Sequence, residues 1–379
     1  MKKNTFLIIS CLLLFFSTNS LAQINGSKLR ISLITCAPGN ELYALFGHTA
    51  IRILDSTNGS DIVYNYGTFD FNDANFYTKF IRGKLDYFLS TEDYTSFLNI
   101  YQYEMRSVTE QVLAFSPEQK ISIQAFLNNN LLGNNKYYHY DFLYDNCTTR
   151  ALQIINTNDT LLTSINNKLV PNGTTYRNML HSYLDAGSHP WSKLGIDLLL
   201  GAKTDKVVTV KESMFLPELL QKGVNNSQGK IVAATTQPYS TNNTYVATGK
   251  YLPIICTTIF ALLIIGIAET KKANRLIPTI DSILFYITGL VGILLLFMWF
   301  GTNHQTCSNN YNLLWAMPIN FFAAFYVWKK PNFFKVYCTI YSILLALLLL
   351  SWWWLPQQLN IAFIPIVVLL SYRTYHLSK

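Results

Sequence analysis

The last third of the chain is a series of apolar runs separated by short connections, and this feature limits the possible folds most strongly. An apolar run of about 20 residues can cross the ~30 Å hydrocarbon core of a bilayer as a helix. We expect five membrane-spanning helices, at residues 251–268, 280–300, 311–328, 335–355 and 356–372. The fifth is the weakest, because it is short and begins beside Gln357 and Gln358.

The charges between these runs predict the orientation of the chain. The basic residues of this part are Lys271, Lys272, Arg275, Lys329, Lys330, Lys335, Arg373 and Lys379. They fall on alternate connections, whereas residues 301–310 and 352–359 carry no Lys or Arg. Since basic connections stay in the cytoplasm, residues 23–250 and the loop around His304 are expected outside the inner membrane of a bacterium.

The N-terminus indicates export. Lys2 and Lys3 precede an apolar run at residues 6–16, and small residues end at Ala22. This is typical of a signal peptide at residues 1–22, cleaved after Ala22, with an uncleaved anchor as the alternative. The net charge of +8 lies beside the apolar runs, while residues 23–250 are balanced. A basic face for nucleic acid is therefore not expected.

Cysteine usage gives little support to a disulfide framework. The six cysteines are at positions 11, 36, 147, 256, 307 and 338. One would leave with the signal peptide and two fall in predicted spans, so Cys36, Cys147 and Cys307 remain outside. Three is an odd number and no Cys-x-x-Cys pair exists, so we expect neither a zinc site nor any other metal. A bridge between Cys36 and Cys307 stays open.

One histidine stands at the start of a predicted strand. Residues 29–35, 49–54 and 62–66 alternate apolar and β-branched side chains, and a turn-rich segment at residues 55–61 separates the last two. If these two strands form a hairpin, His48 lies opposite residues 65–67. Asn65 is then the best candidate to orient the imidazole. The alternative is a hydrogen-bonded histidine without a catalytic role.

One cysteine stands at the start of a predicted helix. In the segment YDFLYDNCTTR at residues 140–150, Asp145 or Asn146 is a suitable cap, so Cys147 falls in the first turn. The helix N-terminus and a neighbouring histidine lower the pKa of such a thiol. Cys147 is therefore a candidate nucleophile, and the free N–H groups of the first turn can hold an oxyanion. A structural cysteine is the alternative.

Several motifs together resemble a known family. SLITCAPGNELYALFGHTAIRI at residues 32–53, YNYGTFDF at 64–71, YDFLYDNCTTR at 140–150 and the stretch at 198–215 are similar to the extracytoplasmic domain of Lnb-type lipoprotein N-acyltransferases. The similarity covers residues 29–222, and a multi-span C-terminal half also fits that family. The resemblance implies an α+β fold: a permuted papain-like domain, similar to NlpC/P60 and lecithin:retinol acyltransferase proteins, followed by an all-α bundle of about five transmembrane helices.

The resemblance also implies a reaction. An acyl chain would pass from a phospholipid donor, through a cysteine thioester, to the α-amine of a diacylated lipoprotein acceptor, with no cofactor. By position in the motifs, His48 corresponds to the base and Cys147 to the nucleophile, whereas Asn65 as the orienting residue rests on the hairpin geometry alone. The domains are expected at residues 1–22 (signal peptide), 23–165 (thiol catalytic domain), 166–250 (extension and linker, the linker at 225–249) and 251–379 (membrane).

Polar residues near these motifs are candidates for substrate binding. They are Arg52, Tyr66, Asp145, Asn146, Arg150 and His304. The two arginines would meet a lipid phosphate, with salt bridges to carboxylates as the alternative, and His304 would position a substrate or simply belong to a hydrated loop. The aromatic residues of segment 69–97 line an acyl-binding surface or form core.

Two other functions stay open at this point. The first is a membrane-anchored, NlpC/P60-like cysteine amidase or peptidase that acts on cell-wall peptide. The second is a non-catalytic membrane assembly module. One span is enough to tether an enzyme, so five spans favour a protein whose substrate comes from the bilayer.

Overall fold

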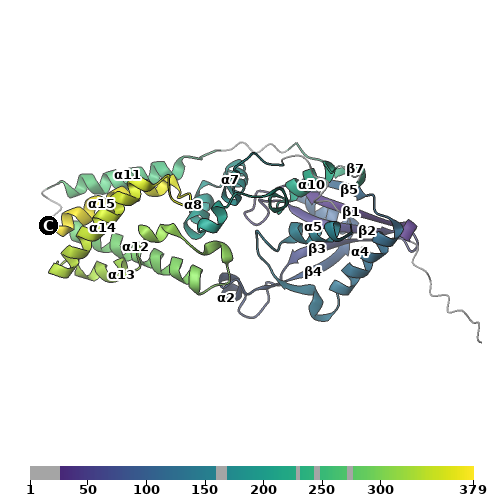
Figure 1. Ribbon diagram of the computed structural model, residues 1–379, viewed down its shortest axis with the longest axis horizontal. Coiled ribbons are helices and arrows are strands. Elements are labelled where there is room, and N and C mark those ends of the chain that lie inside the picture. The colour runs from purple at the N-terminus through teal and green to yellow at the C-terminus, as the bar shows by residue number, and fades with distance from the viewer. Residues whose placement is uncertain (1–25, 159–168, 228–230, 243–247, 271–275) are drawn as a thin grey trace, which may run out of the picture.

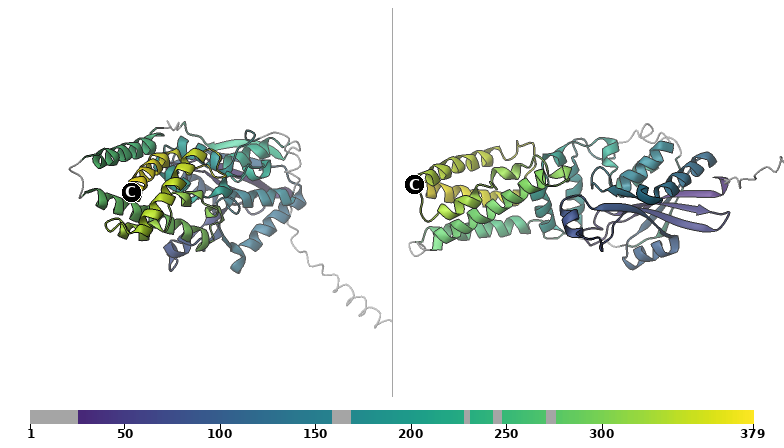
Figure 2. Two further views of the ribbon diagram at one scale, coloured as in Figure 1. Left: turned by 60° about the vertical axis from the view of Figure 1, so that its left-hand side comes forward. Right: turned by 90° about the horizontal axis from the view of Figure 1, so that it is seen from below.

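The computed structural model describes residues 26–158, 169–227, 231–242, 248–270 and 276–379. The predicted signal peptide and the predicted domain boundary at residue 165 lie outside these residues. The molecule is elongated, with a sheet-containing part at one end, a bundle of long helices at the other, and short helices between them (Figure 1). The right-hand view in Figure 2 shows the same separation of sheet and bundle.

The extracytoplasmic part is built on one antiparallel sheet. Its strands are β1 (Leu29–Cys36), β2 (His48–Asp55), β3 (Ser60–Thr68), β4 (Asp86–Asp93), β5 (Val108–Leu113), β6 (Tyr137–His139) and β7 (Val232–Tyr239). Their order is β6-β4-β3-β2-β1-β5-β7. The three strands expected from alternating residues are confirmed as β1, β2 and β3. The expected α+β class is also confirmed, while the papain-like topology stays a prediction.

Each face of the sheet carries helices because its strands bury alternate apolar residues on both sides. On one face, Ile31, Leu33 and Ile51 pack with α4 (Pro117–Asn130) and α5 (Cys147–Asn158). On the other face, Ile34 and Ala50 pack with α3 (Tyr94–Tyr103). Strands buried on both sides explain the nearly continuous apolar runs of β1 and β2.

The segment expected to be a linker contains part of the sheet. β7 pairs with β5 along its length, from Leu113↔Val232 to Val108↔Tyr239. The prediction of a linker at residues 225–249 is therefore wrong for this strand. The polar residues of β7 are explained by its position, because an edge strand is covered less than a central one.

Four helices dominate the membrane part: α11 (Leu252–Ala268), α12 (Leu276–Phe300), α14 (Asn332–Ser351) and α15 (Ile364–Ser378), the last preceded by η8 (Ile361–Phe363). Among the described residues, three helices are long and apolar enough to cross a membrane: 276–300, 332–351 and 361–378; α11 is shorter. The expected count of five is not confirmed. The fifth predicted span, which has the weakest support from sequence, overlaps the helix at residues 361–378 and is therefore one of these three.

The third predicted span, residues 311–328, is not a continuous helix. It consists of η6 (Tyr311–Leu314), α13 (Asn320–Ala323) and η7 (Ala324–Tyr326). Pro318 interrupts the run because it has no N–H to donate and its ring clashes with the preceding turn. The Asn320 amide donates to Thr288 on α12, 3.1 Å away. This buried polar contact holds the segment against α12, and the segment does not continue as a regular helix.

Short helices connect the sheet to the outer ends of the membrane helices. They are α7 (Tyr176–Ala186), α8 (Pro190–Leu199), η3 (Ala202–Asp205), α9 (Val210–Ser213) and α10 (Pro217–Asn225). Gly201 N–H donates to Thr306 O (2.8 Å), and the Asn312 amide donates to Asp197 O (3.0 Å). The sheet is docked to the membrane part through these contacts, with the C-terminal end of β1 directed toward it (Figure 1).

Candidate active site

The structure brings His48 and Cys147 into contact. β2 begins at His48 and α5 begins at Cys147. The two elements are joined one residue further on, where the hydroxyls of Thr49 and Thr148 lie 3.0 Å apart. The His48 side chain hydrogen-bonds the Cys147 sulfur, to which the Thr49 backbone N–H also donates. Both His48 and Cys147 are partly exposed, so a substrate can reach them.

Gly67 lies beside this contact, in a backbone conformation that favours glycine. The β2–β3 ladder runs from Asp55↔Ser60 to Ile51↔Tyr64, and the same register sets His48 level with Gly67. Gly67 has φ +96°, and a Cβ added there would lie 3.9 Å from the Cβ of Cys147. A register shift between Asn65 and Thr68 interrupts the β3–β4 ladder at this point. Such irregularities often redirect side chains beside functional sites.

Asn65 is hydrogen-bonded to the imidazole, as the hairpin geometry predicts. His48 Nε2 lies 3.1 Å from Asn65 Oδ1, and Asn65 Nδ2 donates to Glu92 Oε1 at 2.8 Å. Because the carboxylate of Glu92 accepts only, it fixes which end of the Asn65 amide faces His48. Nε2 therefore donates, which leaves Nδ1 of the neutral ring as the nitrogen able to take a proton.

The two partners shift each other's pKa in opposite directions. Burial opposes the charged form of each group. Even so, the negative charge of the Cys147 thiolate, its hydrogen bond and the bond from Asn65 raise the pKa of His48 above its usual value. The imidazolium and its hydrogen bond, with smaller contributions from Thr49 and Thr148, lower the pKa of Cys147. These directions favour a thiolate–imidazolium pair.

Asn146 caps the helix that begins at Cys147. Its Oδ1 accepts from the N–H groups of Thr148 and Thr149, both at 2.8 Å. Its Nδ2 donates to the carbonyls of Phe142 (2.7 Å) and Phe215 (3.0 Å). Of the first-turn N–H groups considered for an oxyanion, these two are therefore occupied. Among the described residues, the N–H of Cys147 itself has no partner and is available.

Asp145 and Arg150 form an ion pair close to Cys147 in the chain. Arg150 Nε and Nη2 donate to the two carboxylate oxygens of Asp145 at 2.7 and 2.8 Å. The guanidinium also stacks on Tyr138, with 3.6 Å from Cζ to the ring centroid, and lies near Tyr66. Burial raises the pKa of Tyr66 to about 12, so its phenol stays protonated. A partly exposed pair here can still meet a polar substrate group.

The structure corrects the interpretation of Arg52. Its Nε and Nη2 donate to Asp61 at 2.7 and 2.6 Å, and its Nη1 donates to Glu110 at 2.8 Å. The guanidinium also covers the ring of Tyr94. Because Arg52 is buried and engaged on every side, the salt-bridge alternative is correct and no phosphate site remains there.

His304 lies at a different place from the Cys147–His48 pair. Its Nε2 lies 3.2 Å from Phe80 O and 3.1 Å from Ile81 O, in helix α2 (Phe76–Ile81). The adjacent Asn303 N–H donates to Arg82 O at 2.9 Å. His304 therefore joins the outer loop to α2, and its direct role in substrate positioning is not supported.

Cys36 and Cys307 are both free and buried, so the bridge left open above is absent from the structure. Burial raises the pKa of Cys36 to about 12 and that of Cys307 to about 11. Neither thiol is suited to act as a nucleophile.

Among the residues that the structure describes, no three His, Cys, Asp or Glu side chains are grouped so that they could hold a metal ion.

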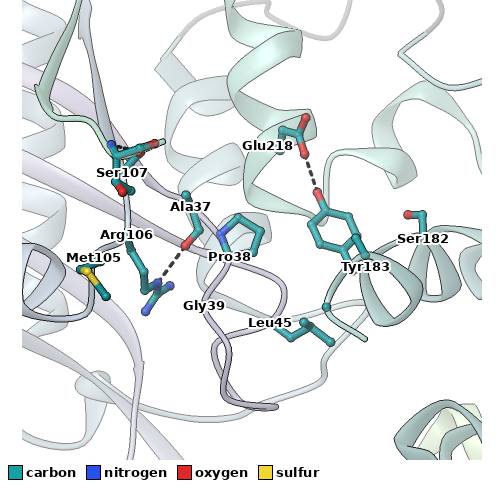
Figure 3. Close-up of a pocket in the computed structure, with 13 residues that line it drawn as sticks. Ala37, Pro38, Gly39, Leu45, Met105, Arg106, Ser107, Ser182, Tyr183 and Glu218 are labelled. Atoms are coloured by element: carbon teal, nitrogen blue, oxygen red, sulfur yellow. Dashed lines mark hydrogen bonds between the residues drawn. The ribbon is translucent and has the colours of Figure 1, made fainter. Parts of the chain in front are cut away.

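A cavity of about 360 Å³ lies beyond the end of β1, and neither His48 nor Cys147 lines it (Figure 3). It begins at Ala37, one residue after Cys36, which is the ladder partner of His48. Arg106 lines one side and donates to Ala37 O at 2.8 Å, while Tyr183 donates to Glu218 on another side at 3.0 Å (Figure 3). The rest of its lining is mostly apolar.

Sequence reasoning missed Glu92, the Thr49 N–H and Arg106. Glu92 is in β4, a strand that was not predicted, and a single acidic residue far from both motifs gives no signal. The Thr49 N–H follows His48 directly, so its position beside the sulfur becomes evident only once α5 is known to pack against β2. Arg106 precedes β5 and reaches the site only through the sheet order.

These features define a class of protein: a membrane protein whose domain outside the membrane presents a paired cysteine and histidine at the end directed toward the bilayer. Comparison with family models identifies it further. The Lnb N-terminal periplasmic domain matches residues 16–182, and the Lnb transmembrane domain matches residues 247–378. Together they cover more than three quarters of the chain.

The chain therefore belongs to the Lnb family, as an inner-membrane protein with a periplasmic N-terminal domain. No curated protein and no solved structure matches it.

Proposed function

We propose that this protein is a thiol-dependent lipoprotein N-acyltransferase. The observation that carries the proposal is the contact between His48 and Cys147 at the start of α5, on the side of the periplasmic domain that faces the membrane helices. Membership of the Lnb family supports the same activity. The donor is a phospholipid, and the acceptor is the α-amine of a diacylated lipoprotein.

In the first half-reaction the Cys147 thiolate attacks the carbonyl carbon of a phospholipid ester. The N–H of Cys147 donates to the oxyanion of the tetrahedral intermediate. The His48 imidazolium gives its proton to the leaving glyceryl oxygen, so the C–O bond breaks and a lysophospholipid departs. Cys147 then carries the acyl chain as a thioester, and His48 is neutral.

In the second half-reaction the lipoprotein amine attacks the thioester carbonyl. His48 takes the amine proton, the C–S bond breaks, and an amide forms. The thiolate–imidazolium pair is then restored. A thioester is reactive toward amines, so neither step requires a nucleotide. Glu92 acts as a positioning residue, because it fixes the Asn65 amide that in turn orients His48.

The test is mass spectrometry of lipoprotein N-termini in a strain that lacks this protein. The wild-type gene is expected to restore the third, amide-linked acyl chain, and a Cys147→Ala variant is expected to leave the termini diacylated. A Cys36→Ala variant is the matched control, since that thiol is buried and should leave acylation intact. Unchanged termini in the deletion strain would contradict the proposal and favour the amidase.

A further inference from the structure

The helix α2 is held at the level of the outer membrane surface. It forms two kinds of contact with the loop that follows α12: Asn303 N–H donates to Arg82 O at 2.9 Å, and His304 Nε2 lies within 3.2 Å of two α2 carbonyls. α12 is one of the helices able to span the bilayer, and its outer end is Phe300. α2 therefore lies beside the end of the helical bundle (Figure 1), at the level where the outer headgroups would begin.

The surface of α2 is unusually apolar for a helix outside the membrane. None of its residues is buried. Tyr77 is 78% exposed, Phe71 just before the helix is 74% exposed, and Phe80 is 50% exposed. Arg82 and Lys84, which follow directly, are also exposed. Aromatic rings next to basic side chains suit the interface of a bilayer, where rings meet acyl chains and cations meet phosphates.

Aromatic rings continue without interruption from α2 to the nucleophile. We call Phe80, Phe76, Phe69, Tyr87 and Tyr140 the aromatic row. Successive ring centroids are 6.1, 5.8, 5.2 and 4.5 Å apart. Tyr140 lies at Gly67, where an added Cβ would be 3.8 Å from its ring and 3.9 Å from the Cβ of Cys147. The row thus begins at the membrane surface and ends beside the sulfur.

The exposure of the row distinguishes it from ordinary core. Phe80 is exposed, and Phe69, Phe76, Tyr87 and Tyr140 are all partly exposed, whereas core rings such as Phe97 are 1% exposed. A partly exposed apolar strip leaves a hydrophobic driving force for a ligand that covers it. The strip is continuous, which suits an extended hydrocarbon chain.

We propose that the acyl chain of the donor phospholipid lies along the aromatic row, which carries its ester from the outer leaflet to Cys147. This inference rests on the proposed function, since it names the path that the donor takes to that site. α2 contacts the leaflet, Arg82 and Lys84 face the phosphates, and the chain covers Phe76, Phe69 and Tyr87. Once covered, the strip keeps water from the thioester.

The experiment uses the full chain in proteoliposomes that contain a phospholipid with a photoreactive diazirine in its acyl chain. After illumination, labelled peptides are mapped by mass spectrometry. We expect labels on residues 69–87 in addition to the membrane helices. Labels confined to the membrane helices would overturn the inference, and this result does not depend on whether Cys147 is catalytic.

A second experiment distinguishes the lipid path along the aromatic row from the acylation reaction at Cys147. Cys147 is acylated either from phospholipid or from p-nitrophenyl acetate, a small soluble ester that needs no path through the membrane surface. A Phe69→Ser variant, which breaks the row at its centre, is expected to slow acylation by phospholipid about tenfold and to leave acylation by the soluble ester unchanged. Phe126→Ser on α4, an exposed phenylalanine outside the row, is the control.

The outcomes are distinct. No loss with phospholipid would overturn the path while leaving the acyltransferase intact. If the wild-type protein forms no thioester with either ester, the proposed function fails, and the label map alone then decides whether lipid occupies the row. A misfolded variant would lose activity with both esters, and the unmodified protein would again decide by its label map.

Discussion

The ionisation of Cys147 depends on one neighbour. Burial alone would raise the pKa of this thiol, as it does for Cys36, whose thiol has no hydrogen bond with an imidazolium. For Cys147, the charge of His48 and its hydrogen bond outweigh burial, so the pKa of Cys147 is lowered. Two cysteines near the same end of the sheet therefore differ in the direction of their pKa shifts, because only the Cys147 side chain is hydrogen-bonded to His48.

The pH dependence of alkylation should show this difference. We expect iodoacetamide to modify Cys147 at pH values below the ordinary pKa of a thiol, about 8.5, while Cys36 stays unmodified. In a His48→Ala variant burial dominates, so the pKa of Cys147 rises and its alkylation shifts to higher pH. Peptide mapping over a pH series measures both profiles. A profile that the His48 substitution does not move would contradict the ion pair.

Glu92 should act through Asn65 and not through the substrate. In Glu92→Gln the negative charge that favours the imidazolium is lost, so the pKa of His48 falls and the basic limb of the acylation rate moves to lower pH. We also expect the rate at its optimum to fall roughly tenfold, since a hydrogen bond to a charged group contributes about 1.5–3 kcal/mol. The measurement is the pH–rate profile of Cys147 acylation.

The matched control for this variant is Glu212→Gln. Glu212 pairs with Lys206 at 2.6 Å on the exposed side of α9, so it should leave both the rate and the profile unchanged. A Glu92 variant that lowers the rate without moving the basic limb would indicate a purely structural role.

At the scale of elements, the start of α5 is fixed from two sides. The Asn146 side chain satisfies two N–H groups of the helix and also donates to the carbonyls of Phe142 and Phe215. The cap thus connects the helix to the preceding loop and to the segment before α10. The position of the sulfur depends on this connection, because Cys147 is the next residue.

An Asn146→Ala variant should lose more stability than a variant that removes an ordinary helix cap. The loss of a cap costs about 0.5–2 kcal/mol, and two buried carbonyls left without donors add about 1–3 kcal/mol each. Ser116→Ala, at the exposed cap of α4, should cost only about 1 kcal/mol. Thermal unfolding of the detergent-purified variants measures both. Equal shifts would contradict the bracing role of Asn146.

Local sequence signals were sufficient for the hairpin and for the cap of α5. His48, Asn65 and Cys147 were found because alternation, a turn-rich segment and a capping pair act over a few residues. Glu92 was not found, because its contact with Asn65 depends on β4 being the next strand in the sheet. β7 was not found either, since an edge strand with Thr235, Thr236, Gln237 and Pro238 at its centre lacks the apolar pattern of β1.

The third predicted span failed for a related reason. Mean hydropathy detects an apolar segment, but it does not detect that Pro318 stops the helix or that Asn320 binds Thr288. The arginines show the same limit: Arg52 and Arg150 had equal support from sequence, and only the sheet partners of Arg52 distinguish them.

At the scale of the whole molecule, a buried polar network joins the periplasmic and membrane parts. Asp197 accepts from Arg177 at 2.7 Å and from the Asn360 amide at 2.8 Å, and it lies 2.8 Å from His181 Nε2. Arg177 is fully buried and also bonds Asp205. Since Asn360 precedes the last membrane helix, this network connects the periplasmic part to the membrane helices and fixes the position of the sheet relative to the bilayer.

An Arg177→Leu variant tests this role. It leaves Asp197 and Asp205 buried without their cation, which should destabilise the protein by about 3–5 kcal/mol. Lys206→Ala, in an exposed pair, should cost at most about 1 kcal/mol. Because the Cys147–His48 contact lies within the sheet and α5, acylation by p-nitrophenyl acetate should persist below the lowered unfolding temperature, while acylation by phospholipid falls. Equal retention of both activities would mean that the position of the sheet above the membrane does not depend on the Arg177 network.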